Sequence, residues 1–215
     1  MASAVLCASN APKPTSKCVK PLRACCFSSC LKLPKQDSNT SVLPGTRSPR
    51  RRPRVCSPTK RTSCPAKRWL LSRYAQLADR LIGALHADVL IFGSGEERPL
   101  AEEIARAMKH TPLILAGETS LRQLMALFAQ CRLVVSNDSG SMHLAAALGL
   151  PVVAIFGSTD ERATGPVGAR ARVVKKPVDC SPCGLRECPI DFRCMKSVSV
   201  DDVFVAALEL VKEAA

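Results

Sequence analysis

The polar residues best suited to chemistry in this chain lie in the stretch SNDSGSMHLAAAL, between two apolar runs. The apolar run before it is typical of a strand, and the one after it has helical spacing. The pattern therefore predicts a strand, a tight turn and a helix. Asn137 or Asp138 would cap that helix, Ser139 would add a hydroxyl donor, and Gly140 would let another group approach the backbone closely.

The chemistry that suits such a turn is the binding of an anion. The free N–H groups at a helix amino end and the positive end of the helix dipole both favour a phosphate. His143 lies near the first turn, where its imidazole could stabilise a diphosphate that gains charge as it leaves. The same residue types are also ordinary capping chemistry, and a single His on a helix is often structural. These residues alone leave both interpretations open.

A second group of reactive side chains is a cysteine cluster near the carboxyl end of the chain. Its members are spaced C-x2-C-x4-C-x5-C and are Cys180, Cys183, Cys188 and Cys194. Four thiolates at this spacing suit a structural zinc ion, and an iron–sulfur cluster could use the same four. Free reduced thiols are the alternative, since two disulfides would require an oxidising compartment. No His lies nearby, which argues against a catalytic role.

The elements that must position these groups begin near residue 69. Apolar runs typical of buried strands alternate with segments of helical spacing. The strands are expected in 87–95, 112–117, 132–138 and 151–157, and the helices in 69–85, 96–108, 119–131, 140–149 and 199–214. This alternation predicts an α/β fold with a Rossmann-like, doubly wound parallel sheet over residues 61–215. Ligands of such sheets bind beyond the carboxyl ends of the strands, where the turn before residue 140 would lie.

The amino-terminal third has a different character. The chain of 215 residues has a net charge of +13, and residues 1–68 hold 15 Lys and Arg but one acid, Asp37. Residues 1–60 are rich in Ser, Pro, Arg and Cys and show no periodicity, so we expect them to be disordered. Three interpretations remain open: a transit peptide, a polyanion-binding tail through RSPRRRPR, or a wrong-frame translation joined to a domain. No apolar run reaches the roughly 18 residues that span a bilayer.

Several stretches together resemble glycosyltransferase family 9, the ADP-heptose:lipopolysaccharide heptosyltransferases, and in particular the heptosyltransferase II branch. The resemblance covers roughly residues 60–215 in order. It is carried by AKRW, IFGSGEE, LAGETSLRQLMAL, VVSNDSGSMHLAAALGLPVVAIFGSTD, TGPVG and CSPCGLRECPIDFRCM. It implies the carboxyl-terminal domain of a GT-B glycosyltransferase, which binds the nucleotide-sugar donor. The family is inverting and uses no metal at the diphosphate, and the chain shows no Asp-x-Asp motif.

The resemblance also implies roles for particular residues. Around the donor diphosphate and sugar it places Asp138, Ser139, Gly140 and His143. Lys67 matches the family's donor-binding lysine in its Lys-x-Trp context. Glu96 or Glu97, after the GSG turn, is expected at the ribose hydroxyls, with complementation of a helix dipole as the structural alternative. No cofactor is expected for catalysis, and a structural zinc would be bound by the cysteine cluster.

The expected reaction is attack by an acceptor-sugar hydroxyl on the anomeric carbon of the heptose, with ADP leaving. A general base must take the hydroxyl proton, and the family keeps that base in an amino-terminal acceptor domain. Residues 1–60 are too short and wrongly composed to be that domain, so whether this polypeptide is active alone is left open. The partners expected are an ADP-sugar and, with an acceptor domain, the lipopolysaccharide core.

Other functions fit the same elements. The alternatives are another GT-B sugar-nucleotide enzyme of the epimerase kind, a non-catalytic nucleotide-binding remnant, and a module that binds nucleic acid through its basic tail. No aromatic platform or groove-reading helix supports specific binding of nucleic acid. The expected location is cytoplasmic, at most peripheral to the inner membrane, or an organelle if residues 1–60 are a transit peptide.

Overall fold

The computed structural model describes residues 5–9 and 64–214, which belong to one compact unit. In the described residues a six-stranded sheet runs in the order β3-β2-β1-β4-β5-β6. The strands are β1 (Val5–Ser9), β2 (Asp88–Phe92), β3 (Leu113–Ile114), β4 (Cys131–Asn137), β5 (Val152–Ile155) and β6 (Ala171–Val174). The β2–β3, β4–β5 and β5–β6 pairs are all parallel. The parallel α/β sheet predicted for residues 61–215 is therefore confirmed.

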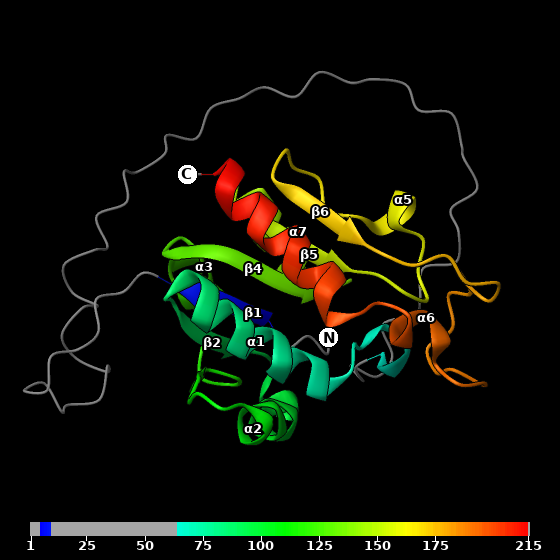
Figure 1. Cartoon of the computed structure of the whole chain (residues 1–215), viewed down its shortest axis with the longest axis horizontal. Coiled ribbons are helices and arrows are strands. Elements are labelled where there is room, and N and C mark those ends of the chain that lie inside the picture. The colour runs from blue at the N-terminus through cyan, green and yellow to red at the C-terminus, as the bar shows by residue number, and fades with distance from the viewer. Residues whose placement is uncertain (1–4, 10–63, 215) are drawn as a thin grey trace, which may run out of the picture. The chain divides into compact units, whose positions relative to one another are not determined.

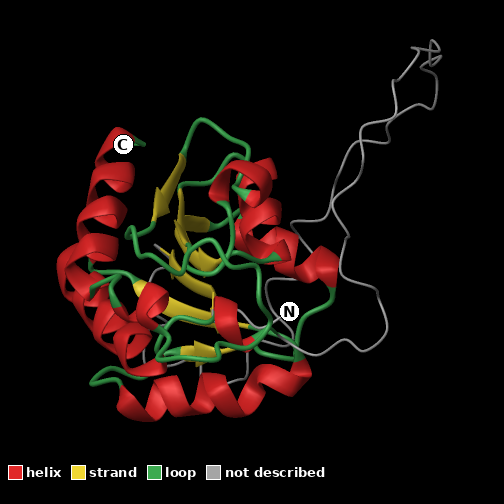
Figure 2. Ribbon diagram, turned by 90° about the vertical axis from the view of Figure 1, so that its right-hand side faces the viewer, coloured by secondary structure: helices red, strands yellow, loops and turns green. Residues whose placement is uncertain are grey.

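Helices cover both faces of this sheet (Figures 1 and 2). The α-helices are α1 (Leu71–Leu85), α2 (Arg98–Ala107), α3 (Leu121–Phe128), α4 (Gly140–Ala147), α5 (Glu161–Thr164), α6 (Arg193–Lys196) and α7 (Val200–Glu213). Two short 3-10 helices, η1 (Pro65–Lys67) and η2 (Gly95–Glu97), precede α1 and α2. In the described residues no helix is both long enough and apolar enough to cross a membrane.

The strand side chains alternate between two hydrophobic cores. Along β4, Leu133 and Val135 belong to the core shared with α1 and α7, whereas Val134 belongs to the core shared with α3 and α4. In β5, Val153 belongs to the core shared with α1 and α7, and Val152 belongs to the core shared with α3 and α4. This alternation explains why β4 and β5 are continuous apolar runs in the sequence, because both faces of these two strands are buried.

The described residues depart from expectation at the first strand. Val5–Ser9 lies within the segment expected to be disordered, yet it forms β1 and pairs antiparallel with both β2 and β4. The stretch VLCA is apolar, but it is too short to indicate a strand from the sequence alone. The other predictions for residues 1–60 concern positions outside the described residues. A further strand, β6, was also missed because its sequence ARVVKK is short and charged on both sides.

The parallel strands bring their carboxyl ends to one edge of the sheet. The turn after β2 leads to η2, the turn after β4 leads to α4, and the turn after β5 leads to α5. Each of these turns belongs to a stretch that the sequence singled out. The fold therefore gathers at one edge three turns that are far apart in the chain, between Phe92 and Glu161.

Candidate functional site at the carboxyl edge of the sheet

The centre of this edge is an ion pair between Lys67 and Asp138. The Lys67 Nζ atom lies 2.6 Å from Asp138 Oδ2, although the two residues are 71 positions apart. The Asp138 side chain is only 6% exposed, while that of Lys67 is 29% exposed. The carboxylate is therefore withdrawn from water, and the ammonium group faces outward from it. The structure thus brings together two residues that the resemblance assigned to one site.

Asn137 holds both sides of this pair in place. Its fully buried side chain accepts hydrogen bonds through Oδ1 from the Trp69 backbone N–H at 3.3 Å and from the Tyr74 hydroxyl at 2.8 Å. The Trp69 indole in turn donates to the Val198 carbonyl at 3.0 Å. Burial raises the pKa of Tyr74 far above its ordinary value, so its hydroxyl stays protonated and can donate. Asn137 therefore fixes the segment that follows Lys67 against the strand end that precedes Asp138.

The amino end of α4 has no side-chain cap. The helix begins after Ser139, whose side chain makes no capping hydrogen bond and lies 3.0 Å from the Ser136 hydroxyl instead. The expectation that Asn137 or Asp138 caps this helix is wrong, because Asn137 binds Trp69 and Tyr74. The Asp138 carboxylate is likewise engaged, by Lys67 and by the Thr164 hydroxyl at 3.3 Å.

The first backbone N–H groups of an α-helix have no partner within the helix. At α4 these are the N–H groups of Gly140, Ser141 and Met142. The His143 N–H is the first in the helix that donates to a preceding carbonyl, that of Ser139, at 3.5 Å. Gly140 is exposed, so no side chain covers the start of the helix. His143 is exposed as well and lies one turn further on, on the same side as Gly140. The open helix end and the imidazole therefore face the same solvent region.

Glu97 has a structural role that the sequence left as an alternative. It is 6% exposed, and its Oε2 accepts a hydrogen bond from the Ser94 N–H at 2.7 Å, which closes a capping box at η2. Its other oxygen, Oε1, is buried without a hydrogen-bond partner among the described residues. Glu96 is exposed. Of the two candidates, Glu97 is the one fixed at this edge, with one oxygen still able to accept a hydrogen bond.

The turn after β3 requires glycine where it contacts η2. Gly117 has a φ of +77°, and a Cβ there would lie 2.7 Å from the Gly95 Cα. The turns that follow β2 and β3 therefore touch through their backbones, and no larger residue fits at Gly117 in this arrangement. This contact fixes the position of the turn that carries Glu97.

Thr164 is a site residue that the sequence did not single out by role. It lies at the end of α5, and its single hydroxyl proton is shared between Asp138 Oδ2 at 3.3 Å and the Asp160 carbonyl at 3.1 Å. The only sequence signal was its place at the start of TGPVG. A short helix after β5 is needed to bring its hydroxyl to Asp138, and nothing local predicts that approach.

The residues from 180 to 194, which hold the four predicted cysteine ligands and are called the cysteine segment below, lie directly beside η1 and the turn after β5. Gly184 N–H donates to the Ser158 carbonyl at 2.7 Å, and the Arg186 carbonyl accepts from Ala66 N–H at 3.1 Å and from the Cys64 thiol at 3.4 Å. The four predicted ligands, Cys180, Cys183, Cys188 and Cys194, are all free thiols. Across the part of the chain that is described, no three His, Cys, Asp or Glu side chains are arranged to hold a metal ion. The zinc site therefore stays a prediction.

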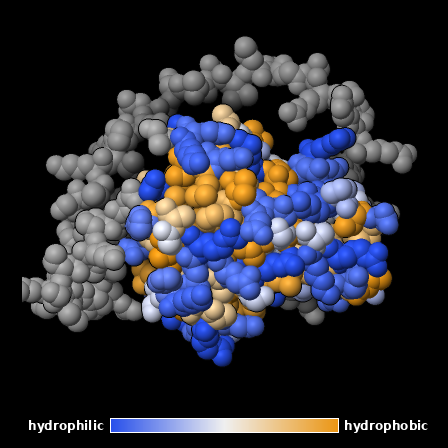
Figure 3. Space-filling view, in the orientation of Figure 1, coloured by the Kyte–Doolittle hydropathy of each residue, from blue (hydrophilic) through white to orange (hydrophobic). Residues whose placement is uncertain are grey.

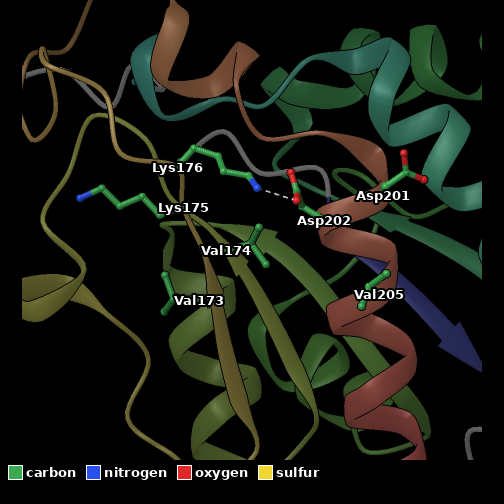
Figure 4. Close-up of a pocket in the computed structure, with 7 residues that line it drawn as sticks. All are labelled: Val173, Val174, Lys175, Lys176, Asp201, Asp202 and Val205. Atoms are coloured by element: carbon green, nitrogen blue, oxygen red, sulfur yellow. Dashed lines mark ion pairs between the residues drawn. The ribbon is translucent and has the colours of Figure 1, made fainter.

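A shallow pocket of about 380 Å³ lies further along the same edge, between β6 and α7 (Figure 4). Lys176 closes one side of it with an ion pair to Asp202 at 2.7 Å, whereas Lys175 points away and pairs with Glu161 at 2.6 Å. Apolar side chains gather over β6 and α7 on this face of the molecule (Figure 3), and Val205 is 53% exposed. No residue that the sequence predicted for the site lines this pocket.

Comparison with known proteins decides the family. The model of glycosyltransferase family 9 (heptosyltransferase) matches residues 31–192 of this chain. The chain belongs to glycosyltransferase family 9. The match begins 30 residues before the expected domain boundary at residue 61, in a range that lies outside the described residues.

The relatives of this family 9 chain include heptosyltransferases of type 2. Lipooligosaccharide heptosyltransferase 2 of Haemophilus influenzae is 41% identical over 115 residues, which are 52% of this chain and 33% of the relative. Lipopolysaccharide heptosyltransferase 2 of Escherichia coli is 42% identical over 115 residues, with the same coverage. The chain therefore spans about a third of the length of these relatives.

Solved structures of the family confirm the fold. The structure of E. coli ADP-heptose lipopolysaccharide heptosyltransferase II superposes with a TM-score of 0.60 at 32% identity, over 70% of this chain and 44% of that one. A glycosyltransferase family 9 protein of Veillonella parvula gives a TM-score of 0.63 at 28% identity, over 71% and 44%. The described residues thus correspond to one part of a GT-B heptosyltransferase, as the resemblance implied.

Proposed function

We propose that this chain is the donor-binding part of a heptosyltransferase and binds the diphosphate of ADP-heptose at the carboxyl edge of its sheet. The observation that carries the proposal is the Lys67–Asp138 pair beside the uncapped amino end of α4. Membership of family 9 supports the class of donor, and the proposed ligand residues are those that the sequence motifs pointed to. The proposed set is Lys67, Glu97, Asp138, Ser139, Gly140 and His143.

The charges at this edge fit a diphosphate. An unpaired Asp138 would repel it, but the Lys67 ammonium offsets that charge at 2.6 Å. An ammonium group has three N–H donors, and the bond to Asp138 uses one of them. The partial exposure of Lys67 leaves the other two for phosphoryl oxygens, and the N–H groups of Gly140 and Ser141 add neutral donors and the helix dipole.

The remaining residues would contact the ends of the donor. The exposed His143 imidazole lies where it can donate to the phosphoryl oxygens as the ADP leaving group gains charge. Glu97 Oε1 is buried without a partner, so it would accept a hydrogen bond from a ribose hydroxyl only if the η2 turn opens when the donor binds. Ser139 would contribute its hydroxyl once its contact with Ser136 is exchanged for one with the ligand.

Transfer of the sugar needs more than the donor site. The acceptor hydroxyl must lose its proton to a base as it attacks the anomeric carbon, and Asp138 is held by Lys67 and Thr164. We therefore infer that the base and the site for the lipopolysaccharide core belong to an acceptor part, in keeping with the third of the relatives' length that this chain spans. Such an acceptor would bring the chain to the surface of the inner membrane.

Titration calorimetry of the whole chain with ADP tests the donor site. We expect Lys67→Met to weaken ADP binding by about 10- to 100-fold, because it removes a charged hydrogen bond worth about 1.5–3 kcal/mol. The matched control is Lys196→Met, which removes an exposed lysine from α6 outside the proposed site. Asp138→Asn, which keeps the shape but not the charge, should weaken binding by releasing Lys67. Absence of binding by the unsubstituted chain, or equal affinity in Lys67→Met, would contradict the proposal.

A further inference from the structure

The cysteine segment is hydrogen-bonded to residues near each partner of the Lys67–Asp138 pair, rather than to the pair itself. On the Lys67 side, the Arg186 carbonyl accepts a hydrogen bond from the N–H of Ala66, the residue directly before Lys67. On the Asp138 side, the segment is bonded to the turn after β5, which leads through α5 to Thr164. A change of conformation in this one segment would therefore reach the ion pair from two directions.

Two of the contacts to the turn after β5 involve residues next to a cysteine pair. The Ser181 hydroxyl, between Cys180 and Cys183, donates to the Gly157 carbonyl at 2.5 Å. The N–H of Gly184, directly after Cys183, donates to the Ser158 carbonyl at 2.7 Å. Gly157 lies close to the Met195 side chain of α6, since a Cβ at this position would lie 2.9 Å from the Met195 sulfur. The conformation of the 180–183 stretch therefore bears on the position of Gly157 and Ser158.

The thiols of this pair differ from that of Cys194. Cys183 is exposed and Cys180 is half-buried, whereas Cys194 is buried. A reagent in solution therefore cannot reach the Cys194 thiol in this conformation. Cys183 is the thiol of the segment that a reagent in solution can reach, and Cys180 follows the C-x2-C spacing in which a second thiol can complete a disulfide.

We propose that Cys180 and Cys183 form a reversible disulfide switch that weakens donor binding when it is oxidised, an inference that rests on the proposed function. The oxidant is a small disulfide such as oxidised glutathione. The Cys183 thiolate attacks one sulfur of the reagent, whose S–S bond breaks and releases one glutathione thiolate. The Cys180 thiolate then attacks the Cys183 sulfur and releases the second. Two protein thiols are oxidised to one disulfide, and the reagent is reduced to two thiols.

The disulfide would act through geometry. It requires the two Cβ atoms to lie about 3.8 Å apart, with a fixed torsion about the S–S bond. Closing this small ring turns Ser181 and Gly184 relative to the Gly157 and Ser158 carbonyls. The turn before α5 then shifts, and Thr164 loses its contact with Asp138. We expect ADP affinity to fall about tenfold, which is within the usual range of coupling between two sites.

The test compares reduced and oxidised whole chain by peptide mass and by ADP calorimetry. Both cysteines fall in one tryptic peptide, residues 176–186, which should become lighter by two hydrogen atoms on treatment with oxidised glutathione. ADP binding should weaken about tenfold and recover with dithiothreitol. Cys183→Ser should keep the affinity of the reduced chain under oxidant. The matched control Cys188→Ser removes a cysteine of the same segment and should respond like the unsubstituted chain.

Each other outcome bears on the inference. A peptide that keeps both thiols, a disulfide without loss of affinity, or a Cys188→Ser chain that no longer responds would overturn it. If the reduced chain does not bind ADP, the result contradicts the proposed function, and calorimetry cannot test the switch. The switch is then tested by amide hydrogen exchange of residues 157–164, which should become faster on oxidation, and unchanged exchange would overturn it.

Discussion

The amino ends of α4 and α7 begin alike in sequence and differ in structure. Each helix follows a serine, Ser139 for α4 and Ser199 for α7. Ser199 accepts a hydrogen bond from the Asp202 N–H, and Asp202 accepts one from the Ser199 N–H at 2.9 Å, so the end of α7 is closed by its own residues. Ser139 makes no such bond.

The difference arises from the third residue of each helix and from the neighbouring strand. At α7 this residue is Asp202, whose carboxylate can complete a capping box, whereas at α4 it is the fully buried Met142. The Ser139 hydroxyl lies against Ser136 of β4 instead. We interpret the closed end as structural and the open end as the place where a ligand replaces the cap. The comparison separates residues that stabilise the fold from residues that we propose bind the donor.

The largest effect on stability is expected beneath the open end, at Asn137. Asn137→Ala should lower the free energy of unfolding by about 3 kcal/mol, because it leaves the buried Tyr74 hydroxyl and Trp69 N–H without their acceptor. Urea unfolding would measure this change. Tyr74→Phe, which removes only one of the two donors, should cost about 1 kcal/mol. A loss below about 1 kcal/mol in Asn137→Ala would show that Asn137 does not hold this edge together.

A smaller effect should distinguish the two helix ends directly. Ser199→Ala should cost about 1 kcal/mol of stability because it removes a cap, whereas Ser139→Ala should stay within about 0.5 kcal/mol. The two substitutions are chemically identical and can be compared in the same unfolding experiment. Equal losses at both positions would mean that α4 is capped after all, and that its open end is not a distinguishing feature.

The sequence predicted those parts of the molecule that depend on local patterns. The helix expected over 199–214 and the strand expected over 132–138 correspond to α7 and β4, and both follow from residue types within a few positions of one another. The fold class also follows, since it needs only the alternation of such elements. The grouping of Asp138, Ser139, Gly140 and His143 required no more than one strand–turn–helix unit.

The sequence could not predict contacts made between distant segments. Lys67 and Asp138 meet only because Asn137 holds Trp69 and Tyr74, across more than 60 positions of the chain. The same is true of Thr164, whose partner Asp138 is 26 positions away. Capping of α4 by Asp138 was a reasonable local expectation, and it failed because a distant lysine competes for the same carboxylate.

The measurement that tests the donor site most directly is a titration of the chain with ADP, followed through its amide resonances. The account predicts that the N–H signals of Gly140 and Ser141, at the open end of α4, shift strongly as the diphosphate binds. Those of Val200 and Asp201, at the closed end of α7, should stay where they are. Shifts confined to α7, or no shift at Gly140 and Ser141 with ADP in excess, would contradict it.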